Sequence, residues 1–132
     1  MARFKTAFAS TAFIFSAFAN ASDKLDVAML QRVADDMNKS LPTWQDRDTR
    51  LDKMTVGPGL AWTFDFTLVN AEFSKELADS FRTNSAPSVT RQFCSLPTTQ
   101  FLIQQQVISK LRHSDRRGKT VSEIILDRDK CR

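Results

Sequence analysis

Residues 60–69 read LAWTFDFTLV, and this stretch decides the fold class of the chain. Large apolar side chains occupy every second position, and smaller or polar residues occupy most positions between them. These apolar residues are Leu60, Trp62, Phe64, Phe66 and Leu68. A period of two places alternate residues on opposite faces of a β-strand. The stretch therefore predicts a strand with one strongly apolar face.

The residues before this strand predict its hairpin partner. Residues 49–56 also look extended, but Leu51 and Met54 are three positions apart and cannot share the face of a regular strand. We therefore expect a β-bulge or a late strand start in this segment. Gly57, Pro58 and Gly59 suit a type II turn, which needs a positive φ after the proline. Residues 49–69 should form an antiparallel hairpin.

Helical patterns lie on both sides of the hairpin. Between residues 23 and 40 apolar side chains recur every four positions, at Leu25, Met29, Val33 and Met37, with Leu30 and Ala34 beside them. This is an amphipathic helix that should end at Leu41-Pro42 and cover the sheet. After the hairpin we expect Asn70 to cap a second helix that buries Phe73, Leu77 and Phe81 and breaks within residues 83–88. Further helical pieces should carry Val89 and Phe93 and begin again at Ser95-Leu96-Pro97.

The last 25 residues predict a second hairpin. Residues 107–113 and 120–127 should be its strands, and residues 115–118 its turn. Hairpins separated by helices indicate a single α+β domain over residues 22–132. We expect an antiparallel sheet of two β-hairpins, packed against an N-terminal helix and two or three central helices and covered on one face.

Residues 1–21 have the three parts of a secretory signal peptide: a basic start, an apolar run from residue 7 to 19, and the small-residue end Ala19-Asn20-Ala21. The apolar run of 13 residues is shorter than the ~20 needed to span a bilayer. We expect cleavage near Ala21 and a periplasmic or secreted protein. No cysteine lies near the cleavage site, so lipoprotein anchoring is unsupported, and no later segment is apolar enough to span a membrane.

Removing residues 1–21 changes the composition. The whole chain has 19 basic and 15 acidic side chains, and two of the basic ones, Arg3 and Lys5, belong to the signal. The net charge falls from +4 to +2, and the phenylalanines fall from 11 to six. A charge this small disfavours a strongly basic nucleic-acid binder.

The mature chain contains two cysteines, Cys94 and Cys131. In an exported protein two cysteines allow one intramolecular pairing, so we predict a Cys94–Cys131 disulfide. A redox or zinc role is weakly supported, because there is no CxxC pair and only one histidine.

Two charged clusters are candidate partner-contacting surfaces. One contains Asp46, Asp48, Arg50 and Asp52; a calcium site there is disfavoured because the glycine and later glutamate of such loops are missing. The other contains Arg112, Arg116, Arg117 and Lys119, with Lys110 if the strand faces align, and should form a basic tip on the second hairpin. It suits an anionic envelope component or an acidic protein surface, although the pattern favours an ordinary solvated turn over a partner-contacting one.

His113, Ser114 and Asp115 are consecutive, and consecutive residues cannot adopt the geometry of a catalytic triad. We expect His113 to be a half-exposed strand histidine, with acid-base catalysis alongside a distant carboxylate as the alternative. No glycine-rich phosphate-binding motif is present, so we expect no cofactor, and no residues are assigned to a metal or to catalysis.

A set of residues spread over most of the mature chain carries a resemblance to a known family. These residues are Asn38, Leu41-Pro42, Asp46, Asp48-Thr49-Arg50-Leu51-Asp52, Gly57, Phe66-Thr67-Leu68, Asn70, Cys94, Asp115, Gly118 and Cys131. With them the chain resembles a family of small exported bacterial α+β proteins of unknown function. Some of these are described as quorum-sensing-regulated virulence factors. The resemblance implies a bacterial source, an exported α+β domain and the Cys94–Cys131 bridge. It implies no catalytic residue or ligand.

These observations predict a non-enzymatic periplasmic or secreted binding or accessory protein, whose charged hairpins contact a protein or an anionic envelope component. A second hypothesis is a small inhibitor or secretion-system accessory protein that inserts residues 116–119 into a partner's cleft. A third is a hydrolase that uses His113 with a carboxylate. The sequence does not determine the oligomeric state.

Overall fold

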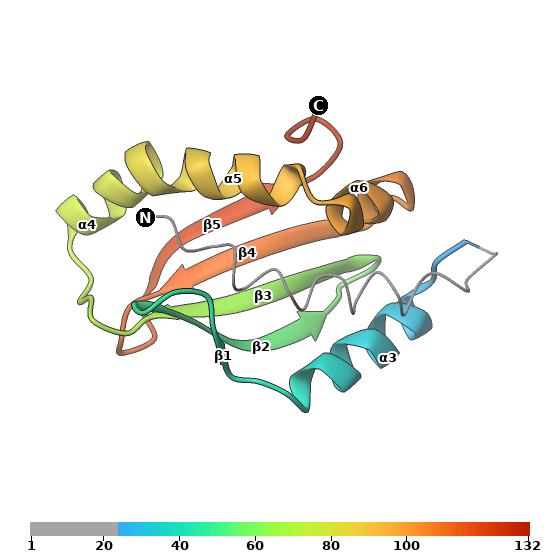
Figure 1. The fold of residues 1–132 in the computed structure, drawn as a ribbon, viewed down its shortest axis with the longest axis horizontal. Helices are drawn as coiled ribbons and strands as arrows, with labels where there is room; N and C mark the ends of the chain where they lie inside the picture. Colours follow the sequence, from blue (N-terminus) through green and yellow to red (C-terminus); the bar gives the residue numbers. More distant parts are fainter. Residues whose placement is uncertain (1–23) are drawn as a thin grey trace.

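The strand predicted from LAWTFDFTLV is the central strand of a five-stranded sheet (Figure 1). The computed structural model describes residues 24–132, so the proposed signal peptide and its cleavage site lie outside the described residues. The strands are β1 (Thr43–Trp44), β2 (Thr49–Val56), β3 (Ala61–Leu68), β4 (Ile108–Ser114) and β5 (Thr120–Leu126). They follow one another across the sheet in chain order. The α+β class is confirmed.

Both predicted hairpins are present, β2–β3 and β4–β5, and each is antiparallel. The two hairpins join through β3 and β4, which run parallel, a pairing that the expected antiparallel sheet did not include. Parallel neighbours need a crossover connection. Here the helical segment between β3 and β4 carries the chain back along the sheet, so β4 starts at the same end as β3 (Figure 1).

The irregularity predicted in β2 is a register shift between Leu51 and Lys53. It allows Leu51 and Met54, three positions apart, both to be buried. In the turn that follows, Gly59 has the positive φ expected after the proline, 73°, but Gly57 also has a positive φ, 98°, and the Gly57–Pro58 peptide bond is cis, two features that the prediction did not include.

Helix α3 (Val27–Asn38) begins at Asp26, whose carboxylate accepts a hydrogen bond from the Met29 N–H. Its most buried residues are Leu30, Ala34 and Met37. They pack in one apolar cluster with sheet residues that include Met54 and Trp62. The predicted amphipathic helix is confirmed, and its buried stripe is centred on Leu30 and Ala34.

The second helical region differs from the prediction. Ser74, and not Asn70, caps α4 (Lys75–Ser80), and the expected break within residues 83–88 does not occur. The chain continues through the π-helix η1 (Phe81–Ser85) into α5 (Ala86–Cys94). Pro87 lies in the first turn of α5, where a missing N–H donor costs little, so the proline does not end the helix.

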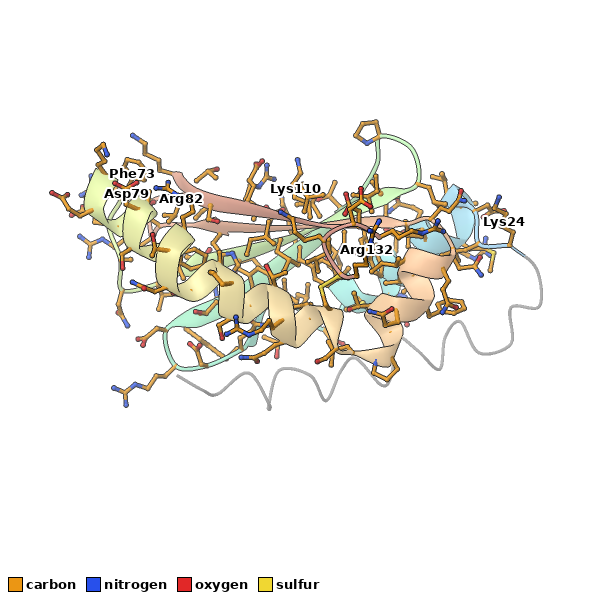
Figure 2. All side chains as sticks on the ribbon, turned by 90° about the horizontal axis from the view of Figure 1, so that it is seen from above. Lys24, Phe73, Asp79, Arg82, Lys110 and Arg132 are labelled. Atoms are coloured by element: carbon orange, nitrogen blue, oxygen red, sulfur yellow. A yellow bond between two sulfur atoms is a disulfide. The ribbon has the colours of Figure 1, made fainter. Side chains whose placement is uncertain are left out.

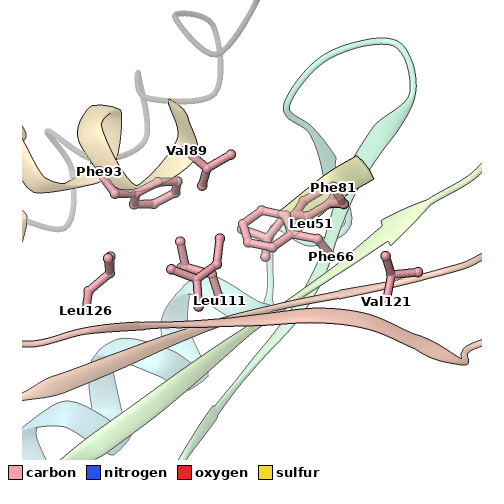
Figure 3. Close-up of a cluster of buried hydrophobic side chains, with 9 residues drawn as sticks. Leu51, Phe66, Phe81, Val89, Phe93, Leu111, Val121 and Leu126 are labelled. Carbon is pink, nitrogen blue, oxygen red and sulfur yellow. The ribbon is translucent and has the colours of Figure 1, made fainter. Parts of the chain in front are cut away.

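Helix α6 (Pro97–Gln104) starts where the Ser95-Leu96-Pro97 pattern predicted. Figure 2 shows α4 to α6 on one side of the sheet. On this side Phe81, Val89 and Phe93 pack against strand residues such as Phe66 and Leu111 (Figure 3). The strand residues that alternate with the buried ones are mostly polar, so the opposite face of the sheet is polar.

The predicted disulfide joins Cys94 and Cys131, 37 positions apart. It links the end of α5 to the segment that follows β5. Among residues 24–132, no helix combines the length and the apolar composition needed to cross a membrane.

Candidate functional site

A groove of about 960 Å³ opens between the helical segment α4–η1–α5 and the loop that joins β1 to β2. Its lining comes from four parts of the chain: residues 46–49, the residues Leu68, Asn70 and Ala71 after β3, one side of the helical segment, and His113 on β4. The charged lining residues are Asp46, Arg47 and Asp48, all on the β1–β2 loop. The groove therefore has one wall with two carboxylates and one guanidinium, and uncharged residues elsewhere.

The helical wall presents a regular stripe to the groove. The residues that line it are Leu77, Phe81, Asn84, Ser85, Ser88, Val89 and Gln92, which recur at spacings of three and four and so lie along one side of the helical segment. Leu77, Phe81 and Val89 make this side partly apolar, and the other four residues are polar and uncharged.

The β1–β2 loop is held in place by hydrogen bonds at both of its acidic residues. The Asp46 carboxylate accepts from the N–H groups of Asp48 and Thr49, both at 2.8 Å. The Asp48 carboxylate accepts from the Asn70 side-chain amide at 2.7 Å, which is the role of Asn70 in place of the predicted helix cap. The carboxylates therefore keep a defined position on the groove wall.

His113 forms part of the floor of the groove, and its environment corrects the expectation of a half-exposed histidine. Only 2% of the residue is exposed. Its ring stacks on Phe66, with 4.7 Å between centroids, and Phe81 lies equally close. The physical reason is strand alternation: His113 shares the inner face of β4 with Ser109 and Leu111, which are also buried.

Burial lowers the pKa of His113 from 6.5 to about 4, so the imidazole is neutral at physiological pH. Its Nδ1 atom is buried and has no hydrogen-bond partner among residues 24–132. The neighbouring Asp115 carboxylate is engaged elsewhere. It accepts from the backbone N–H groups of Lys119, Phe73 and Arg117, and these bonds lower the pKa of Asp115. No acid-base pair between His113 and Asp115 is formed.

The acidic cluster predicted from the sequence is divided by the sheet. Asp46 and Asp48 line the groove, whereas Arg50 and Asp52 form an ion pair on the polar face. Asp52 also accepts a hydrogen bond from the Thr67 hydroxyl. The cluster therefore contributes to two surfaces.

The basic cluster is divided as well. Arg112 is on β4, where it pairs with Asp65 at 2.7 Å and with Glu123 at 3.8 Å, and Lys110 also pairs with Glu123. The hydrogen bond to Asp65 raises the pKa of Arg112.

The remaining three basic residues, Arg116, Arg117 and Lys119, are at the hairpin tip. Arg116 and Arg117 share Glu72 at 3.3 Å, and the Lys119 ammonium lies 4.2 Å from the Phe73 ring centroid. Contact of the two clusters with a partner stays a prediction.

The groove was not predicted, because its walls come from segments up to 67 positions apart, Asp46 to His113. Part of it was detectable from the sequence. The alternation of Leu111 and His113 with Lys110 and Arg112 already places the histidine on the apolar face of its strand. Within residues 24–132 no group of three or more His, Cys, Asp or Glu side chains is arranged to hold a metal ion.

No protein-family model matches the chain, and no curated protein matches it in sequence. Three solved structures share its fold. A Pseudomonas aeruginosa protein assigned as secreted has 18% identity and a TM-score of 0.65, over 80% of this chain and 92% of that one. The pilotin EpsS of the Vibrio vulnificus type 2 secretion system has 12% identity and a TM-score of 0.59, over 80% and 91%.

The type II secretion system pilotin AspS of Vibrio cholerae has 11% identity and a TM-score of 0.59, over 92% of this chain and 99% of that one. At these identities the likeness establishes a shared fold. This chain therefore has the α+β architecture of a protein assigned as secreted and of two secretion-system pilotins.

Proposed function

We propose that this protein is an exported, non-enzymatic accessory protein of a bacterial secretion system, and that it binds a segment of a partner protein in the groove. The observation that carries the proposal is the groove itself, in a fold that secretion-system pilotins share. This corresponds to the second hypothesis from the sequence, with the groove in place of residues 116–119 as the binding element.

The shape of the groove supports a protein segment as its occupant. The helical stripe from Leu77 to Gln92 extends over 16 residues, so a helical or extended peptide segment can lie along it. A long, open groove of this kind matches helix-in-groove recognition.

The chemistry of the groove defines the segment further. Leu68, Leu77 and Phe81 offer apolar surface, which favours apolar side chains on the occupant. Asp46 and Asp48 outnumber Arg47 on the charged wall, so a basic side chain on the occupant is complementary to it. We therefore propose an amphipathic segment with at least one basic residue.

The alternative hydrolase function has little support in this geometry. A general base must reach the proton that it removes. His113 is 2% exposed between two phenylalanine rings, and the distant carboxylates that share the groove with it, Asp46 and Asp48, accept hydrogen bonds from backbone N–H groups and from the Asn70 amide. The imidazole is therefore not placed to reach a proton of a substrate in the groove.

Photo-cross-linking tests the proposal. p-Benzoylphenylalanine is placed at Asn84, an exposed residue that lines the groove, in the full chain produced in its own organism. The matched control carries the same amino acid at Ile108, which is exposed on the polar face of the sheet. We expect an adduct with a secretion-system protein from Asn84 and none from Ile108. Absence of a protein adduct from Asn84, or equal labelling from both positions, contradicts the proposal.

A further inference from the structure

The exposed tryptophan Trp44 lies two residues before Asp46 of the groove wall and is not part of the groove lining. Half of its surface is exposed (50%), although it belongs to β1, the edge strand of the sheet. Within residues 24–132 the other large exposed apolar residues are Val27 and Ile108, both 44% exposed. Tryptophan has the largest apolar surface of the side chains, and at protein interfaces it is strongly enriched among the residues that dominate affinity.

The Trp44 ring is held in place from the side of the sheet. Trp44 pairs with Arg50 of β2, and the Arg50 guanidinium lies 5.8 Å from the ring centroid, in a cation–π arrangement. Arg50 is fixed in turn by its ion pair with Asp52, which Thr67 also contacts. Because the guanidinium charge is already paired, this site offers the partner an apolar ring surface and not an unpaired charge.

A short, rigid connection links Trp44 to the groove. Asp46 is two residues further along the chain, so its Cα lies within about 7 Å of that of Trp44. The backbone N–H groups of Gln45 and Asp46 both donate to the Thr49 carbonyl, at 2.8 and 3.4 Å. The Val69 N–H donates to the Asp48 carbonyl at 3.0 Å. The loop between Trp44 and the groove therefore has a fixed backbone, and it carries the two carboxylates and the Arg47 guanidinium of the groove wall.

We propose that the partner segment extends beyond the groove, across the Asp46–Asp48 loop, and places an apolar or aromatic side chain on Trp44. This inference rests on the proposed function and adds a second anchor to it. The partner segment then has three chemical features in order: apolar residues for the groove floor, a basic residue for the loop, and an apolar side chain for the tryptophan. The Trp44 anchor lies on the polar face of the sheet, so the segment passes around the β1 edge.

The first test places p-benzoylphenylalanine at Trp44, a change that keeps an aromatic side chain at the position. We expect the same adduct, identified by mass spectrometry, as from Asn84. An adduct from Asn84 together with none from Trp44 overturns this inference and leaves the proposed function standing. An adduct from Trp44 alone, or from neither position, contradicts both the inference and the proposed function.

The second test measures the adduct yield from Asn84 in chains that carry one more change. Trp44→Ala should lower the yield at least tenfold, and Trp44→Phe should retain most of it. Val27→Ala and Ile108→Ala remove equally exposed apolar side chains elsewhere and should leave the yield within twofold of the parent. An unchanged yield with Trp44→Ala, or an equal loss with either control, overturns the inference. A far-ultraviolet circular dichroism spectrum that matches the parent's verifies that each variant is folded.

Discussion

At the scale of single residues, His113 makes the stability of the fold dependent on pH. Its pKa is about 4 in the folded protein, against 6.5 for an ordinary histidine. As the pH falls below 6.5, the unfolded chain binds the proton first, so unfolding becomes easier. This contribution to stability is fully present above about pH 6.5 and is lost progressively toward pH 4. The loss is about 3 kcal/mol by linkage.

His113→Phe should remove this contribution to the pH dependence of stability, because phenylalanine has no titratable group. The new ring would lie against Phe66 and Phe81, as the imidazole does. We expect the free energy of unfolding of the variant, measured in urea from pH 4 to 7.5, to change less than that of the parent. Carboxylates titrate in both proteins, so the difference between the two curves isolates the histidine. Parallel curves would show that His113 is not the group responsible.

Asn38 hydrogen-bonds to the edge of β2 beyond the residues that pair with β1. Its side-chain amide accepts from the Met54 N–H at 2.8 Å and donates to the Met54 carbonyl at 2.9 Å, so it occupies the backbone groups that a neighbouring strand would use. Asn38→Ala leaves both groups without these partners. We expect a loss of about 1–3 kcal/mol in urea unfolding. The conservative variant Asn38→Asp retains an acceptor for the Met54 N–H and should lose less.

At the scale of elements, the periodicity of apolar residues predicted the individual strands and helices that depend on it. The alternation at residues 60–69 and the four-residue spacing before residue 40 correspond to β3 and α3. The parallel pairing of β3 with β4 was not predictable in this way, because it depends on the length and direction of the helical crossover. The continuation of the helix through residues 81–85 also escaped prediction, since polar residues and Pro87 there are typical of a break.

The same continuity supplies the long wall of the groove. A break within residues 83–88 would have separated Leu77 and Phe81 from Ser88 and Gln92, and no continuous stripe would exist. The candidate site could therefore be predicted only in parts: the charged residues Asp46 and Asp48 from their clustering, and His113 from its strand face. Its assembly depends on contacts between segments that are distant in the sequence.

A bulky side chain in the α5 part of the wall tests the groove directly. Ser88→Trp should fill it and lower the photo-adduct yield from Asn84 at least tenfold. Because Ser88 is only half-buried and faces open space, we expect a small change in thermal stability, within a few °C of the parent. Arg91→Trp, at an exposed position of α5 outside the groove lining, is the matched control. Equal loss in both variants would indicate a general effect on α5.

At the scale of the whole molecule, the two faces and the β1 edge of the sheet differ in what covers them. Helices cover one face of the sheet. On the other face Arg112 forms ion pairs with Asp65 and Glu123, and Arg50 forms one with Asp52. Ion pairs of this kind leave little unpaired charge for a partner. The β1 edge is different, because the groove, the acidic loop and Trp44 meet there, so this edge is the best-supported partner surface.

The disulfide ties one wall of the groove to the rest of the fold. Cys94 ends α5, which forms one wall of the groove, and Cys131 anchors it to the segment after β5. Closing a loop of 37 residues restricts the unfolded chain and should contribute about 4 kcal/mol. We expect the double variant Cys94→Ser and Cys131→Ser to lose about this amount in urea unfolding. The reduced parent protein should match the double variant, since both lack the same cross-link. If reduction leaves the parent as stable as the oxidised protein, the bridge does not stabilise the fold, and packing of Val89 and Phe93 alone holds α5 against the sheet.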